Sequence, residues 1–410
     1  MKVLFVVQGE GRGHLTQALT LEKMLTDNGH SVVGILVGKS CARELPEFFI
    51  DRAQAPIQTF LSPNFLPSKT NKHIGLTRSI IYNIIKSPNY MSSIHFLKNH
   101  IDKSGADLVI NFYEVLTGIT YYLYQPQVPE VCIGHQYMFL HPEYQLPEEH
   151  KFSQQLMIAF TKVTCLGAKK KLALSFRKYE DDNIQNLSIV PPLLRSEATS
   201  IPRHHGDYVL GYILNAGFSE NVIEWHKRNP KLNLHFFWDR KDAAETTIID
   251  ETLTFHRIDD KKFLHYLANS KAYATTGGFE SVCEAMYMGK PVLLVPAHVE
   301  QECNAFEAMN QGAGIVSNNF NIDQLVEFCH EYGEDVEFRM WENEAEMRII
   351  SRLEAVVEKY NDKITHIQLK PLMQLDKNIR TSKELNIGGT QYTLQQSRIF
   401  VIGEFVLDCG

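Results

Sequence analysis

The sequence predicts an α/β protein with two similar halves in tandem, and three observations lead to this prediction. A short apolar segment at residues 2–7 runs into glycines and then into an amphipathic segment, which is typical of a strand, a tight turn and a helix. The same order returns at residues 272–289. Between them, a proline pair at 191–192 and a polar stretch reaching residue 207 interrupt the pattern, as a linker does.

In the first half, residues 2–7 are expected to form a strand, and leucines with helical spacing predict a helix that ends at Asn28-Gly29. Residues 31–37 then read as a second strand, and this strand–helix–strand unit predicts a parallel sheet. Two further strands are expected at residues 107–110 and 130–133. Polar residues follow both of them, so a site is expected at the carboxyl edge of this sheet.

The second half starts a new series of strands. They are expected at residues 208–214, 234–238, 272–275 and 291–295. We therefore predict two Rossmann-like domains that face each other across a cleft. The predicted boundaries are residues 1–190 for the first domain, 191–207 for the linker, 208–362 for the second domain and 363–410 for a tail without a readable motif.

The composition excludes several classes of protein. Apolar residues make up 44% and charged residues 22% of the 410 residues, which is typical of a globular chain rather than a disordered one. A net charge of −7 argues against a polybasic nucleic-acid binder. The seven cysteines are scattered without a C-x-x-C pair, so we expect reduced thiols. The absence of a signal-peptide core and of a long apolar run predicts a soluble, cytoplasmic protein.

One block of the first half is unusually basic. Residues 52–101 contain no Asp or Glu, while six basic side chains are interleaved with apolar ones, namely Arg52, Lys69, Lys72, Arg78, Lys86 and Lys98. One interpretation is a surface for an anionic or lipid-linked acceptor, or a peripheral contact with the inner face of the membrane. The alternative is an amphipathic helix whose basic face is solvated.

The first chemical motif is Gly9-x-Gly11-Arg12-Gly13-His14, directly after the first strand. Glycines allow a ligand to approach the backbone, and the free N–H groups at a helix start favour an anion. Gly11, Arg12 and Gly13 are therefore predicted to form a diphosphate or acceptor loop. A dinucleotide fingerprint is not complete, because His14 stands where a third glycine is needed.

His14 is the predicted general base, because a histidine at the mouth of such a sheet accepts a proton near neutral pH. Glu114 follows the strand at 107–110 and is predicted to lie at the same edge, where its carboxylate would orient the imidazole. His135 ends the next strand and remains an alternative base.

The second motif is the stronger one. Thr276, Gly277 and Gly278 form a turn before a helix, and their amides with the Ser281 hydroxyl are predicted to bind a diphosphate. Glu284, farther along that helix, is predicted to accept both hydroxyls of a ribose. A polar cluster follows the next strand and is expected to face the same site, with the members Glu300, Gln301 and Asn304.

These motifs resemble the donor-binding signature of GT-B-fold glycosyltransferases. The resemblance is to the group of the peptidoglycan N-acetylglucosaminyltransferase and the UDP-glycosyltransferases, families 28 and 1, in a less characterised microbial branch. It rests on Gly277-Gly278, Ser281, Glu284, Gly289-x-Pro291, Pro296, Glu300-Gln301-x-x-Asn304, Gly312-x-Gly314, the glycine motif that ends at His14, and Pro191-Pro192. Three positions depart from the plant members, which have histidine in place of Thr276 and Trp-Asn in place of Phe279-Glu280.

The resemblance implies a role for each matched residue. Glu284 would bind the ribose diol, Glu300 and Gln301 the donor sugar, and the backbone at Ile258 the nucleobase, while His14 would act as base. It implies a hexosyltransferase that moves a sugar from a nucleotide-diphosphate donor, most simply a UDP-sugar, to an acceptor hydroxyl with inversion. No cofactor and no metal are expected, since the chain has no Asp-x-Asp triplet. A nucleotide-sugar epimerase and a non-catalytic nucleotide-sugar-binding protein remain as alternatives.

Overall fold

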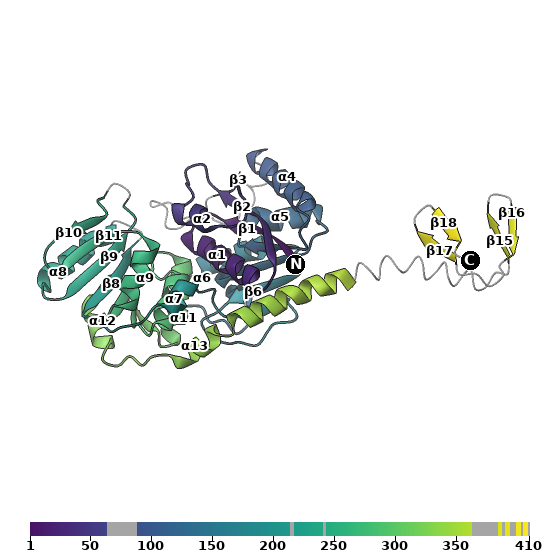
Figure 1. The fold of residues 1–410 in the computed structure, drawn as a ribbon. Coiled ribbons are helices and arrows are strands. Elements are labelled where there is room, and N and C mark those ends of the chain that lie inside the picture. Colours follow the sequence, from purple (N-terminus) through teal and green to yellow (C-terminus); the bar gives the residue numbers. More distant parts are fainter. Residues whose placement is uncertain are drawn as a thin grey trace. The chain divides into compact units, whose positions relative to one another are not determined.

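In a computed structural model, the described residues are 1–63, 88–213, 217–240 and 243–362, with the backbone of four short strands between residues 384 and 408. Two seven-stranded sheets organise the chain up to residue 356, one in each predicted half (Figure 1). The first sheet takes its strands from residues 2–190 and the second from residues 208–316. The prediction of two Rossmann-like halves is therefore confirmed, while the predicted domain boundaries stay a prediction.

The first sheet is parallel throughout. Its strands are β1 (Lys2–Gln8), β2 (Ser31–Lys39), β3 (Ile57–Leu61), β4 (Leu108–Phe112), β5 (Glu130–Gly134), β6 (Lys170–Leu174) and β7 (Leu187–Val190). They lie in the order β3-β2-β1-β4-β5-β6-β7. The chain order reverses beside β1, so the carboxyl ends of β1 and β4 flank a topological switch point, where ligands of such sheets bind.

Helices cover the first sheet. They are α1 (Arg12–Asp27), α2 (Glu47–Arg52), α4 (Pro88–Lys103), α5 (Val115–Tyr124) and α6 (Lys151–Thr164), with a 3₁₀ turn at His135–Leu140. Leu4 and Val6 of β1 pack in one apolar cluster with residues of α4 and α5. All residues from Val3 to Val7 are nearly fully buried, which requires cover on both faces, as parallel sheets have.

The second sheet is parallel except at one edge. Its strands are β8 (Tyr208–Ile213), β9 (Asn233–Trp238), β10 (Thr246–Ile248), β11 (Leu253–Arg257), β12 (Ala272–Thr275), β13 (Val292–Leu294) and β14 (Gly314–Val316). They lie in the order β10-β11-β9-β8-β12-β13-β14, and β10 pairs antiparallel with β11. Here the order reverses beside β8, which repeats the plan of the first sheet.

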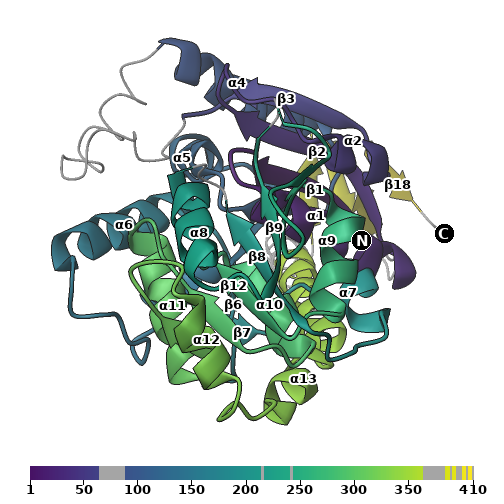
Figure 2. The ribbon, with the colours of Figure 1, turned by 90° about the vertical axis from the view of Figure 1, so that its left-hand side faces the viewer.

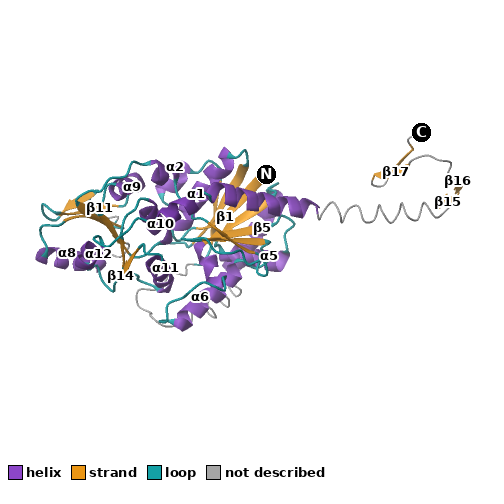
Figure 3. Cartoon of the chain, turned by 90° about the horizontal axis from the view of Figure 1, so that it is seen from below, coloured by secondary structure: helices purple, strands orange, loops and turns teal. Residues whose placement is uncertain are grey.

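Helices also flank the second sheet. They are α7 (Ser196–Ser200), α8 (Gly217–Arg228), α9 (Asp260–Ala268), α10 (Phe279–Tyr287), α11 (Val299–Asn310), α12 (Ile322–Phe328) and α13 (Val336–Glu342). Figure 2 shows α8 and α12 on one side of the sheet and α9 on the other, and residues of α8 and α12 share one apolar cluster with the strands. Figure 3 shows α1 and α10 side by side between the two sheets, so the starts of these helices meet where the halves join.

A final helix, described over residues 345–362, returns to the first half (Figure 1). Arg352 pairs with Asp181 at 3.3 Å, and Glu354 lies 3.2 Å from His30. Just before this helix, the Trp341 indole donates to the Ser175 carbonyl at 3.0 Å. Residues 357–410 form a separate unit, in which β15 (Glu384–Ile387) pairs with β16 (Thr390–Thr393) and β17 (Ile399–Ile402) with β18 (Phe405–Asp408).

Candidate active site

The site lies where the carboxyl ends of the strands in both sheets bring polar side chains together. From the first half come the loop after β1 and the residues after β5. From the second half come the starts of α10 and α11. Direct contacts join the two sets, because Gln136 donates to Glu300 at 2.9 Å and Arg12 to Asp260 at 2.6 Å. The structure therefore brings the two predicted motifs into one site.

His14 lies in the first turn of α1 and is buried, with 9% of its surface exposed. Its Nδ1 is 3.3 Å from Gln17 Oε1, and its Nε2 is 3.4 Å from Gln136 Nε2. The ring stacks on Tyr113, with 5.6 Å between ring centroids. Burial lowers the pKa of His14, and the nearby Glu300 carboxylate opposes that shift. His14 is therefore a largely neutral imidazole at pH 7, which is the form that can accept a proton.

Tyr113 follows β4 with a backbone φ of 61°, in the left-handed region that non-glycine residues rarely adopt. This conformation costs on the order of 1–2 kcal/mol, and such outliers gather at functional sites. The Tyr113 hydroxyl bonds to Thr161 at 2.7 Å. The ring that stacks on His14 is therefore held by its backbone at one end and by this hydrogen bond at the other.

The predicted hydrogen bond between His14 and Glu114 is wrong. Glu114 caps α5 instead, accepting from Leu116 N at 3.0 Å and from the Ser62 hydroxyl at 2.8 Å, and no hydrogen bond joins it to His14, although both are described. Its other carboxylate oxygen approaches Gly38 of β2. Burial raises the pKa of Glu114 to about 7. The residue does follow β4 as predicted, but the local cap captures its side chain.

His135 is enclosed between the halves. Its Nδ1 bonds to the Leu174 carbonyl at 2.7 Å, and its ring stacks on Phe279 with centroids 3.9 Å apart. Its Nε2 is 3.4 Å from a carboxylate oxygen of Glu307, and burial lowers its pKa to about 4. This enclosure, with 2% of the residue exposed, favours His14 over His135 as the group that meets an acceptor.

The glycine turn of the second half has the geometry that its sequence predicts. Gly277 has φ of 87°, and Gly278 is the N-cap of α10 without a capping side chain. The Ser281 hydroxyl bonds back to the Gly278 carbonyl at 3.3 Å. An anion at this helix start would meet the positive end of the helix dipole and N–H groups that lack a side-chain cap.

The predicted sugar-binding cluster also braces this turn. Gln301 Nε2 donates to the Thr276 hydroxyl at 3.3 Å, and Asn304 Nδ2 donates to the Gly277 carbonyl at 3.3 Å. Gln301 Oε1 additionally accepts from Ala297 N. Glu300 differs from its neighbours, because its carboxylate points across the interface to Gln136.

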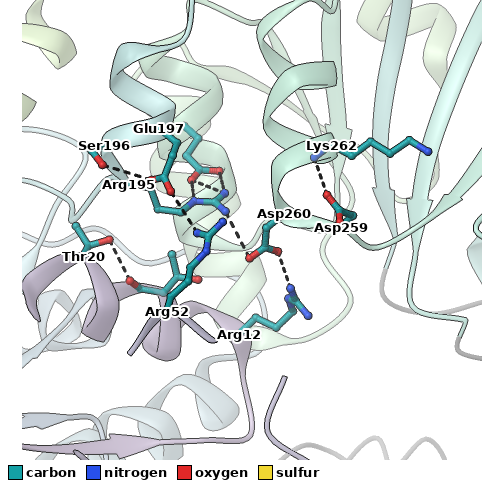
Figure 4. A network of polar contacts seen from close by, with 11 residues as sticks. Arg12, Thr20, Arg52, Arg195, Ser196, Glu197, Asp259, Asp260 and Lys262 are labelled. Atoms are coloured by element: carbon teal, nitrogen blue, oxygen red, sulfur yellow. Dashed lines mark hydrogen bonds and ion pairs between the residues drawn. The ribbon is translucent and has the colours of Figure 1, made fainter. Parts of the chain in front are cut away.

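Glu284 is buried and paired with a residue that the sequence analysis did not select. Arg195 Nε and Nη2 donate to the two carboxylate oxygens of Glu284 at 2.7 and 2.9 Å. Arg195 Nη1 also lies 3.7 Å from Asp260, which in turn binds Arg12. We call Arg12, Asp260, Arg195 and Glu284 the ionic contact. In Figure 4, Arg12 and Arg195 approach Asp260 from different elements.

The ionic contact ties together the elements predicted to surround a donor. Arg12 belongs to the glycine loop of the first half and also lies 4.5 Å from the centroid of the Phe48 ring. Asp260 starts α9, two residues after half-buried Ile258 and next to Asp259, whose side chain caps that helix. Arg195 follows the linker prolines, and it also lines a cavity of 640 Å³ beside the site. Burial lowers the pKa of Arg195, but Glu284 and Asp260 outweigh burial and raise it.

Glu280 has turned away from the glycine turn toward the first half. Gln17 Nε2 donates to its Oε1, and a Cβ added at Gly13 would lie 2.5 Å from its Oε2. A side chain at position 13 would therefore require this carboxylate to shift. Burial raises the pKa of Glu280 to about 7, and Glu300 adds to the shift. We call Glu280, Gln17, His14, Gln136 and Glu300 the amide chain, since two amides link its members.

The described residues contain no group of three or more His, Cys, Asp or Glu side chains that could hold a metal ion. Within the same ranges, no helix combines the length and apolar character that crossing a bilayer needs. Of the basic block at 52–101, residues 64–87 lie outside the described part, including Lys69, Lys72, Arg78 and Lys86. The two remaining basic residues have acidic partners, Glu197 for Arg52 and Asp102 for Lys98.

The two facing sheets and the site at their joint define a glycosyltransferase of the GT-B class. The family model described as glycosyl transferase family 1 matches residues 1–332. The chain therefore belongs to glycosyl transferase family 1. A search of curated proteins gave no match.

Solved structures show the same fold. A glycotransferase of kitacinnamycin aligns with a TM-score of 0.59 at 16% identity, over 86% of this chain and 98% of that chain. The glycosyltransferase VinC in complex with DTDP aligns at 0.54 and 16%, over 88% and 100% of the two chains. Arabidopsis thaliana UGT89C1 complexed with UDP aligns at 0.57 and 13%, over 88% and 99%.

Proposed function

We propose that this glycosyltransferase moves a hexose from a nucleoside diphosphate sugar, most simply a UDP-sugar, to an acceptor hydroxyl, with inversion and without a metal or cofactor. The observation that carries this proposal is the position of α10. Its glycine turn and Glu284 belong to one half, and its first turn faces His14 of the other. Structural neighbours in complex with UDP and DTDP support a nucleotide donor.

In the proposed complex, the donor diphosphate binds at the start of α10, next to Gly277, Gly278 and Ser281. The leaving diphosphate gains charge as the glycosidic bond breaks, and the helix dipole stabilises that charge more in the transition state than in the ground state. Arg12 and Gly11 of the opposite loop are available to the same anion. Backbone amides and arginines thus stabilise the diphosphate charge that a divalent cation stabilises in the other glycosyltransferase architecture.

The proposed ribose site is Glu284, and its pairing with Arg195 is compatible with that role. A carboxylate has about four lone-pair sites, of which the two Arg195 bonds use two. The ribose hydroxyls can therefore donate to Glu284 while Arg195 holds the carboxylate in its orientation. Ile258 would contact the base through its backbone, and Glu300 with Gln301 the sugar hydroxyls.

His14 is the proposed base. Its neutral imidazole removes the proton of the acceptor hydroxyl, whose oxygen then attacks the anomeric carbon opposite the departing diphosphate. One displacement of this kind inverts the configuration. We also propose a cytoplasmic enzyme whose acceptor is anionic or lipid-linked, with residues 52–101 as the surface that meets it or the membrane.

A thermal-shift screen with nucleoside diphosphates and their sugars tests the donor class. A ligand at 100 times its Kd stabilises the folded protein by about 2.7 kcal/mol, so a UDP-sugar donor should raise the Tm by several degrees. The matched variants are Glu284→Ala, which should reduce the shift by about half or more, and Glu251→Ala, an exposed acid of the same half that should keep it. Equal shifts in the two variants, or none in the wild type, would contradict the proposed donor site.

Product analysis separates the alternatives. With a UDP-sugar alone, an epimerase would return an altered nucleotide sugar without a second substrate. A transferase would release UDP only when the sugar reaches an acceptor or water. A binding protein would do neither, and His14→Ala would then change nothing that can be measured.

A further inference from the structure

The amide chain is a continuous series of polar contacts that crosses the joint between the halves twice. It begins at Glu280, whose Oε1 accepts from Gln17 Nε2. Gln17 Oε1 is 3.3 Å from His14 Nδ1, and His14 Nε2 is 3.4 Å from Gln136 Nε2. The chain ends at Glu300, whose Oε1 accepts from Gln136 Nε2 at 2.9 Å. Both terminal carboxylates belong to the second half, and the histidine with both amides belongs to the first.

The two carboxylates determine how the amides are oriented. An amide side chain can turn over and exchange its oxygen with its nitrogen, and the surrounding hydrogen bonds decide between the two orientations. Turning Gln17 would place its oxygen against Glu280, and turning Gln136 would place its oxygen against Glu300. Each of these would replace an N–H···O bond by a contact between two acceptors, so both amides present nitrogen to the carboxylates.

The orientation of the amides in turn determines where His14 carries its proton. Gln17 presents an oxygen to Nδ1, so Nδ1 must be the protonated nitrogen. Gln136 presents an N–H to Nε2, so Nε2 must hold the lone pair. With both carboxylates ionised, this is the only placement of protons in which every contact in the chain is a hydrogen bond.

The Glu280 carboxylate is placed for this contact by the backbone of the first half. A Cβ at Gly13 would lie 2.5 to 2.9 Å from its carboxylate atoms. Glu280 therefore fills the space that glycine leaves at the start of α1, one residue from His14. Its carboxylate also accepts from the backbone N–H of Glu280 itself, in the first turn of α10.

We propose that Glu280 is a positioning residue for His14, which acts through Gln17 to fix the tautomer with the proton on Nδ1 and the lone pair on Nε2. Glu300 completes the same task through Gln136. Because both carboxylates belong to the second half, His14 acquires this tautomer when the halves are in contact. The inference rests on the proposed function, in which His14 is the base.

In the reaction, the acceptor hydroxyl takes the place of Gln136 at His14 Nε2. The O–H bond of the acceptor breaks as an N–H bond forms at Nε2. The other ring proton stays on Nδ1, which continues to donate to Gln17 Oε1. The resulting imidazolium is stabilised by the charge of Glu280 through Gln17 and by nearby Glu300. The other ring that faces His14 is Tyr113, and burial raises its pKa so far that it stays neutral.

The test is a ¹⁵N NMR spectrum of the imidazole groups in the full chain, without substrate, at a pH above the pKa of both His14 and Glu280, the latter being about 7. The His14 signals are identified by their loss in His14→Ala. We expect a neutral ring with the proton on Nδ1, which ¹⁵N shifts distinguish from the Nε2–H form. This NMR signal does not depend on turnover, so it tests the tautomer of His14 separately from the proposed function. The proposed function is tested by nucleotide binding.

Two substitutions of Glu280 are expected to change the tautomer of His14 to different extents. Glu280→Gln keeps an oxygen that accepts from Gln17, so the Nδ1–H tautomer should persist. Glu280→Leu removes the acceptor as well, so a substantial Nε2–H population should appear. With a turnover assay, both variants should lower kcat roughly tenfold or more and leave the donor KM nearly unchanged.

Glu251→Gln is the matched control and should alter neither signal. If Glu280→Leu does not fold, Gln17→Leu breaks the same link from the first half and carries the same expectation. An Nε2–H ring in the wild type, or an unchanged Nδ1–H population in the leucine variants, would overturn the proposal.

Discussion

The ionic contact and the amide chain join the same two halves within the same site, yet they handle buried charge differently. In the ionic contact, Glu284 and Asp260 each have an arginine partner. In the amide chain, Glu280 and Glu300 have only amides as partners, and Glu280 lies on the same helix as Glu284. Burial raises the pKa of Glu280 to about 7, whereas the Arg195 cation opposes the rise that burial causes in the pKa of Glu284. We therefore expect the ionic contact to contribute to donor binding and the amide chain to position His14.

The largest expected effect separates these two roles. His14→Ala should lower kcat by roughly 10²–10⁴-fold, which is the usual contribution of a general base, and leave the Kd for UDP unchanged. Steady-state kinetics with calorimetric titration of UDP check both parts. A variant with weak UDP binding and normal kcat would place His14 in the binding region instead.

Breaking the ionic contact from one side should destabilise the fold. Arg195→Met leaves the buried Glu284 carboxylate without its cation, and losing one partner of a buried pair costs about 3–5 kcal/mol of unfolding free energy. Denaturant unfolding measures this loss. The double variant Arg195→Met/Glu284→Gln should recover most of it, because no uncompensated charge remains, and equal losses in the single and double variants would contradict the assigned pairing.

A pH series tests a third contact between the halves, formed by His135 and Glu307. As in the amide chain, the carboxylate forms no ion pair with an arginine or lysine of the described residues. Burial raises the pKa of Glu307 to about 8, so the folded protein keeps a proton that the unfolded chain releases above its usual pKa of 4.5. The stability from this proton is complete below pH 4.5 and is lost as pH rises through 8. His135, with its pKa lowered to about 4, has the opposite effect below pH 6.5.

The two effects offset each other between pH 4.5 and 6.5, so the Glu307 effect should emerge from pH 6.5 to 8. There the wild type should lose at most about 1.4 kcal/mol per pH unit relative to Glu307→Gln. Chemical denaturation at several pH values gives the difference between the two proteins. Parallel curves for wild type and variant would contradict the raised pKa.

The smallest effect is expected at the rim. Arg52 of the first half pairs with Glu197 of the linker helix α7 at 3.4 Å, but their side chains are 27% and 52% exposed. Exposed ion pairs contribute about 0–1 kcal/mol and weaken with salt. Arg52→Ala should therefore change the free energy of unfolding by less than about 0.5 kcal/mol, and a loss near that of Arg195→Met would show that burial does not govern these contacts.

The architecture could be predicted because strong local patterns carry it. The apolar strand at residues 2–7, the glycine turns and the helix stop at Gly289 each depend on neighbours in the chain, and the structure has them as predicted. Short edge strands such as β3 and β10 were missed, since three to five residues give no clear periodicity.

The partners of the site residues could not be predicted in the same way. Glu114 was expected at His14 because both follow strands of one sheet, but the cap of α5 takes its carboxylate. Glu280 and Gln17 are 263 positions apart in the chain, and Arg195 and Glu284 are 89 apart. Contacts between residues so distant in the sequence depend on the tertiary structure, and no local pattern predicts them. Arg195 had one signal, its place three residues after the linker proline Pro192.

Calorimetric titration of UDP into the wild type and Glu284→Ala tests the central claim most directly. Binding to the wild type with a 10- to 100-fold larger Kd in the variant is the predicted result, because a buried carboxylate that accepts two hydroxyls is lost. Equal Kd values in the two proteins, or no binding of UDP or any other nucleoside diphosphate to the wild type, would contradict a nucleotide-sugar site at α10.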